Sequence, residues 1–331
     1  MHVVILGGAG FIGSHLAQAY LERGDEVTVI DGLVPGTGGH RSHLGEPLPP
    51  RLSFLAERVE DVPVLQDVLA TSDLVIDAIA LTAHHRALDE PLLDLELNAS
   101  SHLHVLQALA EIPGKRVLYL GSRGQYGSPK GRRIRENAPQ EPTDVQGIHK
   151  VAAESYYRVY ARMGRCTAAS LRIPNCFGPH QPIHGDDIGL VGSLIRDLVA
   201  GNCVEVYGSG RSRPLLYVDD LTNAVLRLGD HDWPGSGDGG RDKDCGFDAY
   251  NVAGQQVAIE DLAQQIIAIT GRGSYQVKEI PAKIRAMDTG AAQICQDKLI
   301  RTIGSLQQTN LANSLAQTVR YFEEHAHDVA L

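Results

Sequence analysis

The fold is decided by the opening of the chain, where a short apolar run leads directly into three spaced glycines: His2-Val3-Val4-Ile5-Leu6-Gly7-Gly8-Ala9-Gly10-Phe11-Ile12-Gly13. A helical pattern follows to Arg23, and Gly24 is a typical helix C-cap. A second apolar run over residues 27–30 ends at Asp31. Strand, glycine turn, helix and a second strand with a terminal acid are the order of a dinucleotide-binding βαβ unit.

Each glycine of this turn has a physical reason to be there. Gly7 permits a tight turn, Gly10 lets the backbone approach a pyrophosphate, and Gly13 lets helix and strand pack closely. The backbone N–H groups at the helix start, around Phe11 and Ile12, would face the anion. We therefore expect a dinucleotide at this turn.

Asp31 indicates which dinucleotide binds. Its carboxylate would accept hydrogen bonds from the adenosine ribose hydroxyls, and its charge would repel a 2′-phosphate. No arginine follows it directly. The sequence thus favours NAD over NADP.

The rest of the chain repeats the same alternation. Apolar runs over residues 74–79, 116–120 and 171–174 are separated by amphipathic helical patterns. This predicts an α/β fold with a Rossmann-type, doubly wound parallel sheet covered by helices on both faces. A helix near residues 192–200 and a strand over 204–208 follow in a less regular part of the chain.

Composition excludes several classes of function. The 331 residues are 43% hydrophobic, as in a globular protein, and the net charge of -10 argues against a nucleic-acid-binding face. Five scattered cysteines without a Cys-x-x-Cys pair, no long apolar span and no leader pattern predict a cytoplasmic protein away from membranes. The Gly- and Asp-rich segment 229–246 lacks ligand spacing, so no metal site is expected.

A second informative stretch reads Pro142-Thr143-Asp144-Val145-Gln146-Gly147-Ile148-His149-Lys150-Val151-Ala152-Ala153-Glu154. Together with the glycine turn it resembles the extended short-chain dehydrogenase/reductase family, in its NAD-dependent sugar-nucleotide epimerase/dehydratase branch. Further matching motifs are Asn98 after Pro91, Gly121-Ser122-Arg123-Gly124-Gln125-Tyr126-Gly127, Leu171-Arg172-Ile173-Pro174-Asn175-Cys176-Phe177-Gly178-Pro179, and Gly208-Ser209-Gly210-Arg211-Ser212-Arg213 followed by Tyr217-Val218-Asp219-Asp220. The likeness runs in order over nearly the whole chain.

The resemblance implies roles for individual residues. Lys150 would hold the nicotinamide ribose and Ser122 would orient a sugar hydroxyl, while Pro174 would lie against the cofactor. Substrate contacts would come from Asn175, Arg213, Arg285 and Tyr126. It also implies a smaller C-terminal α/β substrate lobe, formed by residues 174–213 plus 254–331, beside an NAD-binding domain of residues 1–173 plus 214–253.

The chain departs from the family where the chemistry is done. Gln146 stands where the family has a tyrosine, and a primary amide does not take up a proton near neutral pH. Arg123 and Gly124 follow Ser122 where related dehydratases and decarboxylases carry carboxylates, which counts against both reactions. In the adenine-contacting segment 57–61 we expect Arg58 at the key position.

The missing base has several candidate substitutes. His84 and His85 follow the fourth strand, where the family loop approaches the substrate, and imidazole titrates in the useful range. Tyr126 and Cys176 are weaker candidates. His149 lies next to Lys150, but one helical step turns it about 100° away, toward the core or a partner helix. Gln146 would then position the substrate hydroxyl or a bridging water.

These features favour an active NAD-dependent epimerase of a nucleotide-sugar with an altered proton relay. Two alternatives stay open: a catalytically silent NAD or nucleotide-sugar binding protein, and a sugar-nucleotide reductase or dehydratase with different acid–base groups. The resemblance also implies a homodimer, packed through the helices near residues 98–111 and 149–163. The outer positions expected there are Leu103, Leu106, Tyr156 and Tyr160.

Overall fold

The computed structural model describes residues 1–129, 133–185, 188–233, 246–281 and 293–325. Its centre is a seven-stranded, entirely parallel sheet with the order β3-β2-β1-β4-β5-β6-β10. The strands are β1 (His2–Leu6), β2 (Glu26–Ile30), β3 (Leu52–Leu55), β4 (Leu74–Asp77), β5 (Arg116–Ser122), β6 (Thr167–Ile173) and β10 (Phe247–Asn251). The order reverses between β1 and β4, which is where doubly wound sheets bind their ligands.

Helices cover both faces of this sheet, because alternate strand residues are buried on opposite sides. Val3 and Ile5 point into the core beneath α1 (Phe11–Arg23) and α8 (Val218–Asp230). Val4 and Leu6 point into the core beneath α2 (Leu65–Ala70), α5 (Ser101–Ala110) and α6 (Val145–Arg162). The predicted Rossmann-type α/β fold is confirmed.

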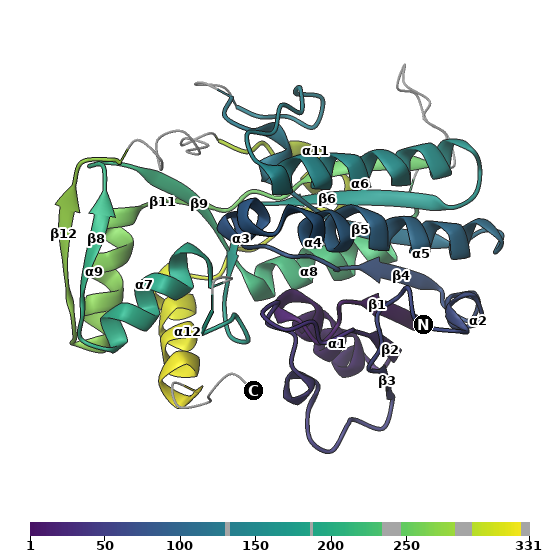
Figure 1. The fold of residues 1–331 in the computed structure, drawn as a ribbon, viewed down its shortest axis with the longest axis horizontal. Helices are drawn as coiled ribbons and strands as arrows, with labels where there is room; N and C mark the ends of the chain where they lie inside the picture. Colours follow the sequence, from purple (N-terminus) through teal and green to yellow (C-terminus); the bar gives the residue numbers. More distant parts are fainter. Residues whose placement is uncertain (130–132, 186–187, 234–245, 282–292, 326–331) are drawn as a thin grey trace.

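A second lobe, drawn at the left of Figure 1, has its own core. It holds a three-stranded sheet of β7 (Asn175–Phe177), β9 (Ser212–Tyr217) and β11 (Gln255–Ala258), and a pair formed by β8 (Cys203–Tyr207) and β12 (Ser274–Lys278). Helices α7 (Gly189–Val199), α9 (Ile259–Thr270) and α12 (Leu311–His325) pack beside them.

Short elements connect these parts at the edge of the main sheet. They are η1 (Arg41–Leu44), α3 (His84–Asp89), α4 (Pro91–Leu95), η2 (Glu96–Ser100), η3 (Arg123–Tyr126) and α11 (Asp297–Ile303). Within the described residues, no helix is long and apolar enough to cross a membrane.

Several element bounds differ from the sequence expectation. The helix expected near residue 192 begins at Gly189, and the strand expected at 171 begins four residues earlier, at Thr167. Strand β9 begins at Ser212 and pairs with β11 in the sheet of the second lobe, so it crosses the domain boundary expected between residues 213 and 214. α11 packs against α8 and β10, so its Leu299 belongs to the core of the main sheet although the helix lies in the segment assigned to the substrate lobe.

Candidate active site

One cavity of about 660 Å³ opens at the carboxyl ends of the central strands and continues between the main sheet and the second lobe. This volume suits a small-molecule or cofactor site. The residues expected from the sequence that line it are Gly7, Gly10, Phe11, Ile12, Gly13, Asp31, Arg58, His84, His85, Ser122, Gln146, Lys150, Pro174, Asn175, Cys176 and Arg213. Residues more than 200 positions apart in the chain thus meet around one space.

The glycine turn has the close approaches that its spacing indicates. Gly7 has a φ of +72°, and a Cβ on it would lie 2.9 Å from the Ala78 carbonyl oxygen. A Cβ on Gly13 would lie 2.2 Å from the Gly7 oxygen, which no side chain tolerates. Gly10 is the N-cap of α1, and a Cβ there would meet the Gly7 oxygen alone, at 3.3 Å. The open side of Gly10 and the helix N-terminus fit the pyrophosphate of a dinucleotide.

Asp31 ends β2 and is held in place by this same turn. Its two carboxylate oxygens accept hydrogen bonds from the backbone N–H groups of Ala9, at 2.9 Å, and Leu33, at 2.8 Å. Burial raises the pKa of this carboxyl, and the backbone hydrogen bonds offset the rise in part. A carboxylate has further acceptor sites, which the ribose hydroxyls of NAD would use.

Arg58, expected at the adenine end, lies across the backbone of Gly32. Its guanidinium pairs with Glu96 at 2.6 Å and with Glu60 at 3.4 Å. Two carboxylates therefore balance its charge beside Asp31, which fits a cofactor without a 2′-phosphate.

Lys150 lies on the floor of the cavity, on α6. Its side chain is almost fully buried, and its ammonium donates a long hydrogen bond of 3.4 Å to the Ile79 carbonyl. Burial lowers the pKa of Lys150 to about 8, although Asp77 and Asp94 act in the opposite direction. Lys150, which the resemblance implies would hold the nicotinamide ribose, therefore lines the cavity.

Gln146 lies one helical turn before Lys150 and is also buried at the cavity wall. Its Nε2 donates to the carbonyl of Leu81 at 2.9 Å. Asn98 clamps the same residue, donating to the Leu81 carbonyl at 2.9 Å and accepting from the Leu81 N–H at 3.2 Å. The side-chain amide at the position where the motif leads us to expect a tyrosine therefore binds the loop after β4.

Ser122 ends β5 and faces the same space. Its hydroxyl oxygen accepts from the Gly124 N–H at 3.0 Å, while the Gln125 side chain accepts from the Ser122 N–H at 2.8 Å. This reciprocal cap fixes the turn after the strand. The hydroxyl is consequently held at the cavity wall.

The two candidate histidines begin α3 and differ in their partners. His84 Nδ1 lies 3.0 Å from Asp144 Oδ2, whereas among the described residues no carboxylate pairs with His85. Asp144 is the N-cap of α6 and also lines the cavity. Its capping position is readable from the sequence, but its pairing with His84, sixty positions away, is not.

The other proposed bases are poorly suited to proton transfer. Burial raises the pKa of the Cys176 thiol far above its ordinary value, so it stays protonated. His149 Nδ1 pairs with Asp94 at 2.5 Å, which agrees with the expectation that it turns toward a neighbouring helix. Tyr126 lies behind the cavity wall, where its hydroxyl donates to Asn251 at 2.7 Å and accepts from Arg172. It does not line the cavity.

The far end of the cavity is built by the second lobe. Asn175 and Arg213 reach it as expected, and Tyr207 and Arg211, which the sequence analysis did not single out, lie beside them. The Gly-Ser-Gly-Arg motif before β9 was the available signal for Arg211. Arg285 lies outside the described residues, as does most of the segment 229–246.

Comparison with known proteins agrees with this arrangement. A family model described as "NAD dependent epimerase/dehydratase family" matches residues 3–244. The UDP-glucose 4-epimerase of Mycolicibacterium smegmatis is 26% identical over 327 residues, covering 97% of this chain and 98% of the relative. A dTDP-glucose 4,6-dehydratase of the same organism is 27% identical over 69% of this chain and 68% of its own length.

Solved structures have the same fold. The UDP-glucose 4-epimerase of Thermotoga maritima, solved with UDP-glucose, superposes with a TM-score of 0.83 at 23% identity and covers 99% of this chain and 100% of its own. The Thermus thermophilus UDP-glucose 4-epimerase in complex with NAD gives a TM-score of 0.79 at 24% identity, covering 98% and 99%. The resemblance drawn from the motifs is confirmed, and the chain belongs to the NAD-dependent epimerase/dehydratase family.

Proposed function

We propose that this protein is an NAD-dependent epimerase of a nucleotide-linked sugar. The observation that carries the proposal is the single cavity that joins the glycine turn and Lys150 at one end to Asn175, Arg211 and Arg213 at the other. A dinucleotide and an anionic sugar nucleotide fit its two ends chemically.

The cofactor end has the groups that NAD requires. The turn containing Gly10 would bind the pyrophosphate, Asp31 the adenosine ribose, and Lys150 the second ribose, with Phe11, Ile12, Gly13 and Pro174 alongside. When bound there, NAD supplies a nicotinamide that accepts a hydride and returns it. Retention of the cofactor through both transfers distinguishes an epimerase from a reductase.

The substrate end favours a nucleoside diphosphate. Arg211 and Arg213 are cationic groups on the wall formed by the second lobe, and guanidinium groups suit phosphate oxygens. The relatives named for UDP-sugars make UDP-hexoses the first compounds to test. In this proposal Ser122 orients the reacting hydroxyl at the middle of the cavity.

We also propose that two parts of the chain divide this work. Residues 1–173 with 214–253 would hold NAD, and residues 174–213 with 254–331 would hold the sugar nucleotide. The separate cores of the two sheets support this division. The segment containing α11 is an exception, since it packs on the NAD side.

The test starts from the purified wild-type protein. We expect NAD to be released on acid denaturation, and 1H NMR to detect C4-epimer formation from UDP-glucose, UDP-N-acetylglucosamine or UDP-glucuronic acid without accumulation of NADH. Arg213→Gln should raise KM for the sugar nucleotide while the NAD content stays constant. Arg301→Gln, an exposed arginine on α11, is the matched control.

Other outcomes would identify the alternatives. Bound NAD with no turnover of any of these sugars would indicate the silent binding protein. Net consumption of NAD(P)H would indicate a reductase, and loss of water from the sugar a dehydratase.

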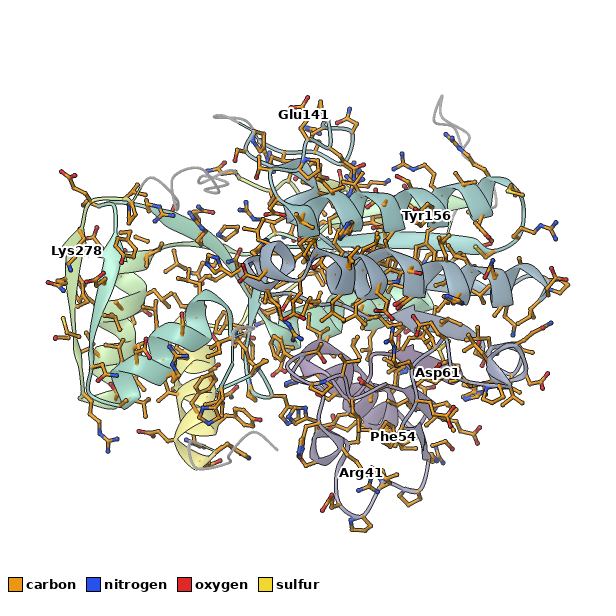
Figure 2. All side chains as sticks on the ribbon, viewed as in Figure 1. Arg41, Phe54, Asp61, Glu141, Tyr156 and Lys278 are labelled. Atoms are coloured by element: carbon orange, nitrogen blue, oxygen red, sulfur yellow. The ribbon has the colours of Figure 1, made fainter. Side chains whose placement is uncertain are left out.

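A homodimer is part of the proposal. On the outer side of α4 and α6, which pack together, large apolar side chains are exposed: Leu92 (78%), Ile148 (53%), Val159 (48%) and Met163 (62%). Tyr156, labelled in Figure 2, and Tyr160 lie on α6 and are partly buried. Leu103, on α5, is also partly buried. Leu106 is fully buried in the core of the chain, so its expected place in the interface was wrong.

We further propose a reducing compartment such as the cytoplasm. Among the described residues the four cysteines Cys166, Cys176, Cys203 and Cys295 are unpaired. Free thiols persist where disulfides are kept reduced.

A further inference from the structure

The loop between β4 and α3 is tied to the first turn of α6 by two side chains. Gln146 donates to the Leu81 carbonyl at 2.9 Å, and Asp144 pairs with His84 at 3.0 Å. Gln146 thus holds the start of the four-residue stretch 81–84, and Asp144 holds its end. Gln146, at the position where a tyrosine is expected, therefore fixes the segment that carries His84.

Asp144 is suited to orient an imidazole. One oxygen caps α6 by accepting from the Gly147 N–H at 2.7 Å, and the other faces His84 Nδ1. Burial raises the pKa of this carboxyl, but the hydrogen bonds from His84 and Gly147 outweigh burial and keep the pKa below its ordinary value. A fixed anion therefore lies beside the ring.

His84 is placed where proton transfer to a ligand is possible. It lines the same cavity as Gln146 and Ser122, and 52% of its side chain is exposed. The carboxylate on Nδ1 directs the opposite nitrogen, Nε2, away from Asp144. This is the arrangement of an orienting acid and a general base.

We propose that His84, oriented by Asp144, takes and returns the substrate proton in place of the absent tyrosine, with Gln146 holding the loop in position. The inference rests on the proposed epimerase function. Asp144 and Gln146 act through His84 and are positioning residues.

The O–H bond of the sugar hydroxyl breaks and its proton passes to His84 Nε2, while the C–H bond of the carbon that bears this hydroxyl breaks, and NAD, when bound, would accept the hydride. A C=O bond forms on the sugar, and the imidazolium is stabilised by Asp144. The hydride would then return to the opposite face of the carbonyl carbon while His84 returns the proton to the oxygen, so that the net redox change is zero.

Three substitutions test the assignment, with readouts beyond turnover. His84→Gln should lower kcat on the order of a hundredfold or more, with NAD content and melting temperature unchanged. Asp144→Asn keeps an oxygen to cap α6 but removes the charge. It should move the titration of the His84 ring, followed by NMR, and the acidic limb of the kcat/KM profile to lower pH together, by about one pH unit. His104→Gln, an exposed histidine on α5, is the matched control.

Three results would overturn the proposal: wild-type turnover in His84→Gln, a loss carried by His85→Gln instead, or a His84 titration that ignores Asp144→Asn. The NMR titration needs no substrate. If no sugar nucleotide is turned over by the wild-type protein, the proposed function fails, whereas an Asp144-coupled His84 titration would still establish the dyad.

Discussion

Gln146 donates its side-chain amide to the carbonyl of Leu81 over 2.9 Å, across 65 positions of sequence. At position 146, where the motif leads us to expect a tyrosine, α6 presents a side-chain N–H group to the loop after β4. Because Asn98 binds the same carbonyl, Leu81 is held from two sides. Gln146 therefore supports the segment that carries His84.

Introducing a tyrosine at position 146 should not raise turnover. We expect Gln146→Tyr to leave turnover equal to or below the wild-type value, because a phenol in this buried slot must displace the Leu81 loop. Gln146→Met removes the donor at similar length and should cost about 1 kcal/mol of unfolding free energy, since Asn98 still satisfies the carbonyl. Steady-state kinetics and urea unfolding measure both effects. A tenfold gain in Gln146→Tyr would mean that position 146 still controls the proton.

Two glycines of the NAD turn should respond differently to substitution. Gly10→Leu should abolish NAD binding in a folded protein, because its Cβ meets only the Gly7 oxygen, at 3.3 Å, while the side chain enters the pyrophosphate space. Gly13→Ala should prevent stable folding, because its Cβ would lie 2.2 Å from that same oxygen. Calorimetric NAD titration and circular dichroism separate the two results. Unchanged NAD affinity in Gly10→Leu would refute the assigned pyrophosphate site.

Stability should depend on pH through a histidine cluster where η1 and α1 meet the second lobe. The rings of His43 and His180 stack with centroids 4.5 Å apart, and His15 lies 4.9 Å from His180. Burial, with repulsion from the neighbouring histidines, lowers the pKa of His43 to about 4 and that of His180 to about 3.

The unfolded chain binds protons at these two histidines more tightly than the folded protein does, so acid should lower the free energy of unfolding. Below pH 6.5 the two rings become protonated in the unfolded chain but stay neutral in the folded protein. The free energy of unfolding is therefore highest above pH 6.5 and falls as the pH drops toward 4. The slope is roughly 1.4 kcal/mol per pH unit for each ring. His43→Gln should flatten this slope in urea unfolding.

A matched variant keeps the backbone at the second position. His180 has a φ of +63°, which asparagine tolerates, so His180→Asn removes the ring without adding strain. The other groups facing the pair are His40, His325, Tyr321 and Asp219, the last paired with His15. An unaltered slope in both variants would assign the acid sensitivity to those groups instead.

The apolar face of α4 and α6 should hold two copies together. Leu92→Glu with Ile148→Glu should give a monomer at micromolar concentration, because two charges would be buried without partners. Val277→Glu, at an apolar residue that is 45% exposed on the second lobe, is the control and should leave the mass unchanged. Light scattering gives the result directly, and a monomeric wild-type protein would contradict the proposed dimer.

The local pattern of the sequence determined the cofactor half of this protein. Strand, glycine turn and helix are encoded within thirty residues, and the steric demands at Gly7 and Gly13 are backbone properties that short-range spacing reveals. Lys150 was identified for a similar reason, since its helix carries a recognisable motif. Such features depend on residues close together in the chain.

The tertiary structure alone decided what surrounds Gln146 and the candidate base His84. Asp144 faces His84, Gln146 faces Leu81, and His43 stacks on His180 because separate loops fold over one sheet edge. No periodicity or spacing reports such pairings, because each joins segments at least sixty positions apart whose approach depends on how whole layers pack. The same reason explains Leu106, whose apolar character was plain from the sequence but whose side, core or surface, was set by the packing of α5 on the sheet.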